Sequence, residues 1–83
     1  NLNKTEIKDK IFLCLEQIGI LIDKNDNVIN LQEYINDSIV FLMFVAEIED
    51  TFKKEIPEDI MFYDQLYDLN NLVDVIDVIL KEE

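Results

Sequence analysis

The sequence predicts a small all-α protein. Apolar residues recur at spacings of three and four in several stretches, as they do on one face of a helix. One Gly and one Pro in 83 residues favour long helices, and the 49% of hydrophobic residues can supply a core. No strand-like alternation is visible. We therefore expect a single domain, residues 1–83, folded as a small four-helix bundle with three longer helices, one short helix and a long loop between helices one and two.

The first helix is expected over residues 5–22. Thr5 could cap it, but Asn3 with Glu6 three residues later forms an equally good capping box. Gly19 near the end marks either a frayed last turn or the C-terminal cap. The residues that form the apolar stripe are Ile7, Ile11, Cys14 or Leu15, Ile18 and Ile22.

Residues 23–36 form a long polar connection, rich in Asp and Asn, whose side chains favour turns. A long structured loop inside a small domain is uncommon and is often functional. Its apolar members should pack onto the helices; they are Val28, Ile29, Leu31 and Tyr34.

The run Asp23-Lys24-Asn25-Asp26-Asn27 spaces its oxygen ligands like the start of an EF-hand calcium loop. The sixth position, which should be Gly for a sharp turn, is Val28. The twelfth, which should be a bidentate Glu, is Tyr34. The pattern therefore favours a solvated turn cluster, and we expect no metal site.

The second helix is expected from Ser38 to Lys53, as the central packing element of the domain. Asp37 stands at the N-cap position and Ser38 just inside it, where a hydroxyl on a rigid element can still reach solvent. The residues expected to face the core are Phe41, Phe44, Val45, Ile48 and Phe52, together with Ile11, Ile18, Leu72 and Ile76.

The run Ile56-Pro57-Glu58-Asp59 should end that helix, because proline cannot continue one. A short helical segment is expected over residues 60–66. Asp68 should cap the last helix, residues 69–81. The residues of its apolar stripe are Leu69, Leu72, Val73, Ile76, Ile79 and Leu80.

The charge is strongly acidic, with 19 Asp and Glu against 7 Lys and Arg and a net charge of −12. Nucleic acid is an improbable ligand, because phosphate binding needs a basic patch, whereas basic protein surfaces are natural partners. The single Cys14 suggests a buried thiol and fits a reducing compartment. No apolar run reaches the length of a membrane span. We expect a monomer in the cytoplasm.

An enzyme is not expected. The chain has no histidine, so the usual nucleophile–base triads are absent. It has no glycine-rich phosphate loop, and no Cys or His set could hold zinc. We therefore assign no catalytic residue.

The chain from about Leu31 to its end resembles the acyl and peptidyl carrier proteins. That family shows an Asp-Ser-aliphatic motif at a helix start, an acidic pair before a helix-ending Phe, an Ile-Pro-acidic step and a capped last helix. The matching residues are Asp37-Ser38-Ile39, Glu49-Asp50 with Phe52, Ile56-Pro57-Glu58-Asp59, and the Leu-x-x-Leu-Val-x-x-Ile run from Leu69 to Ile76.

The chain departs from the family pattern in two respects. Ile35 stands where Gly is common, so the turn into the second helix must be built differently. Val40 and Met43 stand where fatty-acid carriers often have acidic residues. The second departure makes the partner-facing surface more apolar, and it weakens an assignment to fatty-acid synthesis in particular.

The resemblance implies a four-helix bundle of the acyl-carrier-protein type, with 4′-phosphopantetheine attached to Ser38 by a phosphopantetheinyl transferase. Asp37 would cap the helix or be recognised by the transferase. The arm would carry acyl or aminoacyl thioesters between loading and downstream enzymes of fatty-acid, polyketide or nonribosomal peptide biosynthesis. The expected partner surface, with apolar residues beside Ser38 and an acidic rim, consists of Ile39, Val40, Met43, Glu47, Glu49 and Asp50. The alternative is an acidic helical interaction module without a prosthetic group.

Overall fold

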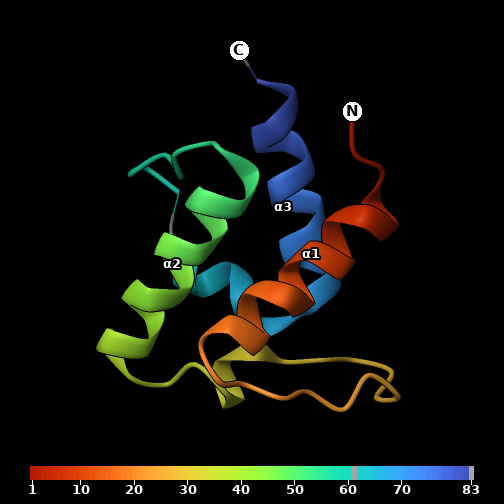
Figure 1. Ribbon diagram of the computed structural model, residues 1–83, viewed down its shortest axis with the longest axis vertical. Helices are drawn as coiled ribbons and strands as arrows, with labels where there is room; N and C mark the ends of the chain where they lie inside the picture. The colour runs from red at the N-terminus through yellow and green to blue at the C-terminus, as the bar shows by residue number, and fades with distance from the viewer. Residues whose placement is uncertain (61, 83) are drawn as a thin grey trace.

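The computed structural model describes residues 1–60 and 62–82, which form a small helical bundle without a strand (Figure 1). Residue 61, within the predicted short helix, and residue 83 lie outside the described part. The elements are α1 (Lys4–Gln17), the 3-10 turn η1 (Leu31–Glu33), α2 (Ser38–Phe52), the 3-10 helix η2 (Phe62–Tyr67) and α3 (Leu69–Lys81). The prediction of three longer helices and one short helix is confirmed, and η1 is an addition to it.

The helix α1 is shorter than predicted. At its start, Asn3 and Glu6 form the capping box, so Asn3 rather than Thr5 is the cap. At its end, Gly19 adopts φ +83°, its N–H donates to Glu16 O (3.0 Å), and the next N–H donates to Leu15 O (2.9 Å). This pair of bonds is a Schellman motif, which ends the helix at Gln17 rather than at residue 22.

The helix α2 ends before the proline step. Lys53, with φ 55° and ψ 42°, is in the left-handed region and donates its N–H to Glu49 O. The Glu49 carboxylate accepts a hydrogen bond from the N–H of Ile56 (2.8 Å), which ties the chain after the helix back to its last turn. Pro57 therefore follows a helix that has already ended.

The last helix follows the prediction. Asp68 caps α3 by accepting a hydrogen bond from Asn70 N–H (2.9 Å), and the helix spans the expected residues 69–81. Its stripe is buried except for Leu80, which is partly buried. This stripe is much more one-sided than that of α2, which explains why the pattern defined it well.

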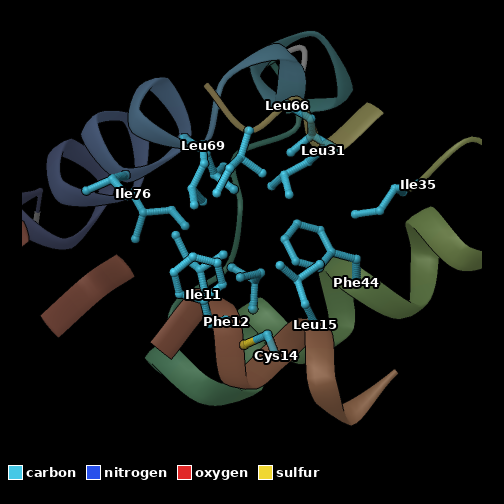
Figure 2. Close-up of a cluster of buried hydrophobic side chains, with 14 of the residues drawn as sticks. Ile11, Phe12, Cys14, Leu15, Leu31, Ile35, Phe44, Leu66, Leu69 and Ile76 are labelled. Atoms are coloured by element: carbon cyan, nitrogen blue, oxygen red, sulfur yellow. The ribbon is translucent and has the colours of Figure 1, made fainter. Parts of the chain in front are cut away.

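The helix α1, not α2, is the central packing element, because it packs against both α2 and α3. Within α2, Phe44 and Ile48 are buried, while Phe41, Val45 and Phe52 are only partly buried. Figure 2 shows the Phe44 ring pointing from α2 into the buried cluster. The prediction thus identified which side of α2 faces the core, but fewer residues on that side are fully buried than expected.

The long connection packs onto the helices as expected, through Ile29 and Leu31, although Val28 is exposed. Its course below α1 and α2 is visible in Figure 1. Ile29 O accepts a hydrogen bond from Leu69 N–H (2.8 Å), and the Gln32 side-chain amide donates to Tyr63 O (3.0 Å). These bonds fasten the loop to η2 and to the start of α3.

Candidate functional site

Ser38 is the first residue of α2 and is exposed. It is also the only serine in the sequence. The carboxylate of Asp37 caps the helix by accepting hydrogen bonds from the N–H groups of Ile39 (2.7 Å) and Val40 (3.4 Å). The capping role expected for Asp37 is therefore observed, and its recognition by a transferase stays a prediction.

The turn into α2 is built from a buried aliphatic residue. Ile35 is fully buried, and its N–H donates to Leu31 O (2.8 Å) as the chain leaves η1. A buried isoleucine and this backbone hydrogen bond therefore form the turn into α2. Because Ile35 is anchored in the core and Asp37 caps α2, the backbone on both sides of Ser38 is fixed.

Ser38 opens onto a shallow hollow of about 260 Å³. Its polar side consists of Asn36, Asp37 and Ser38, and its apolar side consists of Phe41 and Tyr63. Asn36 and Asp37 precede α2, and Ser38 and Phe41 lie in its first turn. Tyr63, in contrast, belongs to η2. The hollow therefore joins two elements that are distant in the sequence.

Aromatic contacts hold the apolar side of the hollow in place. The ring of Phe41 meets that of Tyr63 edge-on, with centroids 5.5 Å apart and planes at 82°. Phe41 also lies 6.3 Å from the ring of Phe62, which in turn stacks against Phe44 at 6.4 Å. Such pairs contribute about 0.5–1.5 kcal/mol beyond their burial. The wall beside Ser38 is thus continuous with the hydrophobic core.

A second hollow of about 340 Å³ continues from the first, because Phe41 and Tyr63 line both. It lies between α2 and residues from the ranges 56–60 and 62–64, and its lining is mostly apolar, with Glu58 and Asp64 as its acidic members. A third hollow of about 560 Å³ lies between Asp59 and the outer side of α3 and shares no lining residue with the hollow at Ser38.

The residues expected on the partner surface divide into two groups. Ile39 (68% exposed) and Met43 (45%) face solvent beside Ser38, whereas Val40 is partly buried against the core. Among the acidic residues, Asp50 is exposed and Glu47 half-buried, while Glu49 is half-buried and engaged with Ile56 N–H. Val40 therefore does not belong to the exposed apolar group, and Glu49 has a structural role at the end of α2.

Sequence reasoning missed three residues of this region. Leu42 is 65% exposed beside Ile39 and Met43, and its position one helical turn from Ser38 could have identified it. Asn36 and Tyr63 line the hollow. Tyr63 lies 25 positions after Ser38, and no local pattern connects the two.

Cys14 is buried, as predicted, and its thiol contacts residues of α2. Its Sγ lies 3.3 Å from Thr51 Oγ1 and 3.7 Å from Glu47 O. Burial raises the pKa of the thiol, while the hydrogen bond with Thr51 opposes this shift. A thiol that stays protonated inside the core is a packing group and a poor nucleophile.

Over residues 1–60 and 62–82, no three His, Cys, Asp or Glu side chains gather as a metal site would require. The Asp23 carboxylate instead accepts a hydrogen bond from Asn25 N–H (3.0 Å) in an exposed turn. None of the helices in these ranges is long and apolar enough to cross a membrane.

Comparisons with family models, with curated proteins and with solved structures found no match for this chain.

Proposed function

We propose that this chain is an acyl or aminoacyl carrier of the acyl-carrier-protein type, with a phosphopantetheine arm on Ser38. One observation supports the proposal most. The hydroxyl is exposed at the first position of a capped helix and opens onto a hollow with a polar and an apolar side. These surroundings fit an arm that begins with a phosphate and continues as a partly apolar chain.

The chain's own part in the attachment is that of a substrate. The Ser38 oxygen would attack the phosphorus of coenzyme A that bears the pantetheine group, the bond from that phosphorus to the bridging oxygen would break, and adenosine 3′,5′-bisphosphate would leave. The hydroxyl proton goes to a base of the transferase, since the sequence offers no histidine. Asp37 holds the helix start in a fixed geometry while this happens. Once attached, the arm supplies a thiol that forms thioesters with the cargo.

The helix end favours the phosphate only modestly. A helix N-terminus stabilises an adjacent anion by typically 0.3–1 kcal/mol when exposed. The Asp37 carboxylate already accepts from Ile39 and Val40 N–H, so those amides are not free for the phosphate. Attachment therefore relies on the covalent phosphodiester bond and not on an anion-binding site.

Partner enzymes would approach the face of α2 next to Ser38. Ile39, Leu42 and Met43 are exposed there, and no Lys or Arg occurs between Lys24 and Lys53. Clustered exposed apolar residues mark interaction sites, and an acidic surround raises the encounter rate with basic surfaces. We infer that loading and downstream enzymes contact these three side chains directly.

The same exposed residues also fit the alternative, an acidic helical interaction module without a prosthetic group. The two functions differ in one measurable respect. A carrier gains mass at Ser38 from coenzyme A, whereas a simple adaptor does not.

The test is an intact-mass measurement after incubation with a promiscuous phosphopantetheinyl transferase and coenzyme A. The wild-type protein should gain one arm, and Ser38→Ala should gain none. Thr5→Ala is the matched control, because Thr5 is an exposed hydroxyl residue in the first turn of α1. A wild-type protein that gains no arm, or a Ser38→Ala protein that gains one, would refute the carrier function.

A further inference from the structure

The hollow at Ser38 is chemically two-sided. Asn36, Asp37 and Ser38 offer oxygen and nitrogen atoms, whereas Phe41 and Tyr63 offer aromatic rings. Any group attached to the Ser38 oxygen therefore starts next to both the polar and the apolar side of the hollow. The polar residues are Ser38 and the two residues before it, whereas the apolar side reaches from α2 to Tyr63 in η2 and gives an attached chain a second surface to lie on.

The Tyr63 ring is the more accessible of the two aromatic walls. Tyr63 is 39% exposed, whereas Phe41 is partly buried and belongs to the packing of the core. An exposed ring loses unfavourable contact with water when an apolar group covers it. Tyr63 therefore offers the larger uncovered aromatic surface to a chain that starts at Ser38.

The position of Tyr63 is fixed before anything binds. Its ring rests edge-on against Phe41, with centroids 5.5 Å apart. Its carbonyl oxygen accepts a hydrogen bond from the side-chain amide of Gln32 (3.0 Å). Contacts from α2 on one side and from η1 on the other thus hold this residue of η2, and a ring held in this way can orient a flexible ligand at low entropic cost.

The chemistry of the arm matches this arrangement. After its phosphate, phosphopantetheine has a carbon that bears two methyl groups, before its hydroxyl and amide groups begin. We propose that Tyr63 is a positioning residue for the arm, whose dimethyl segment packs on the Tyr63 ring. The inference rests on the proposed attachment at Ser38. It assigns to Tyr63 a role in arm orientation and not in the chemistry of attachment.

Nuclear magnetic resonance of the modified protein tests this directly. Wild-type protein carrying the arm should show nuclear Overhauser contacts between the two methyl groups and the ring protons of Tyr63. Tyr63→Phe should keep them, because the contact uses the ring and not the hydroxyl. Tyr63→Ala should lose them and shift the methyl resonances towards those of free pantetheine.

Tyr67→Ala is the matched control, since Tyr67 is also an exposed tyrosine of η2 but does not line the hollow. Its methyl contacts should equal those of wild type. Melting curves of the unmodified variants show separately whether each variant is folded. If Tyr63→Ala unfolds, Tyr63→Leu replaces it. Tyr63→Leu should also lose the ring contacts.

The outcomes separate the two proposals. A wild-type protein that never gains the arm overturns both the carrier function and the role of Tyr63. A modified protein without contacts to Tyr63, or methyl resonances that are the same in wild type and in the folded variant without the ring, overturns the role of Tyr63 alone.

Discussion

Phe44 provides the strongest test of the packing. Its side chain is fully buried, and its ring stacks on Phe62 at 6.4 Å. Truncation of a buried Phe to Ala costs about 3–5 kcal/mol. Each kcal/mol shifts the melting temperature of a domain of this size by about 4–8 °C. Phe44→Ala should therefore melt on the order of 12 to 40 °C below wild type.

The assay is thermal unfolding followed by far-ultraviolet circular dichroism, with Leu42→Ala as the control. Leu42 lies two residues earlier on the same helix but is 65% exposed, so its truncation should change stability by less than about 0.5 kcal/mol. The whole domain has a stability of only about 4–12 kcal/mol by size, so Phe44→Ala is liable to unfold. Phe44→Leu, with an expected loss of about 1–2 kcal/mol, then provides a folded variant. Equal melting temperatures for the Phe44 and Leu42 variants would refute the orientation of α2.

Four further predictions follow from particular residues. Lys53→Gly should stabilise the protein by about 0.5–1 kcal/mol, because Lys53 holds φ 55° at the end of α2 and glycine adopts this conformation without strain. Chemical denaturation measures the free energy of unfolding. A lower stability in the variant would show that the exposed contact of Lys53 with Asp50 (3.4 Å) contributes more than the strain costs. Met43→Glu should leave the melting temperature nearly unchanged but slow modification by the transferase, whereas unchanged kinetics would remove Met43 from the partner surface. Burial raises the pKa of Cys14, so the stability that the protonated thiol contributes is present below its ordinary value of 9.0 and is lost as pH rises above it. Urea unfolding on both sides of pH 9.0 should show a weaker alkaline loss in Cys14→Ala than in wild type, and identical slopes would contradict this. Added sodium chloride should raise the melting temperature, because a net charge of −12 repels itself, and a steady fall would contradict the account of the acidic surface.

The sequence predicted elements best where local signals agreed. The last helix combines a capping Asp68 with a one-sided stripe, and its predicted and observed bounds coincide. The start of α2 was equally well defined by Asp37. The end of α1 was poorly defined, because apolar residues continue at helical spacing to Ile22 although Gly19 turns the backbone away. A single left-handed residue outweighed the periodicity there.

The packing of α2 was harder to predict because apolar residues occur on nearly all its sides. Periodicity identified Phe44 and Ile48 as buried, but it could not show that Phe41 and Phe52 remain half-covered while Leu42 stays exposed. Burial on such a helix depends on which neighbours cover each side. Those neighbours come from distant parts of the chain.

The candidate site shows the same division between local and long-range information. The position of Ser38 follows from the capping motif beside it, which the sequence contains in full. The position of Tyr63 follows from the packing of η2 against Phe41 and from the hydrogen bond with Gln32. Neither contact has a sequence signature, so the apolar wall of the hollow could be identified only from the structure.

We propose that Ser38 carries a phosphopantetheine arm in the protein's natural setting. The most direct measurement is tandem mass spectrometry of the protein isolated from its own cells, on the peptide between Lys24 and Lys53, which holds the single serine. This peptide should carry the mass of phosphopantetheine and release the characteristic pantetheine fragment. A native protein whose peptide is found only unmodified would contradict the proposal.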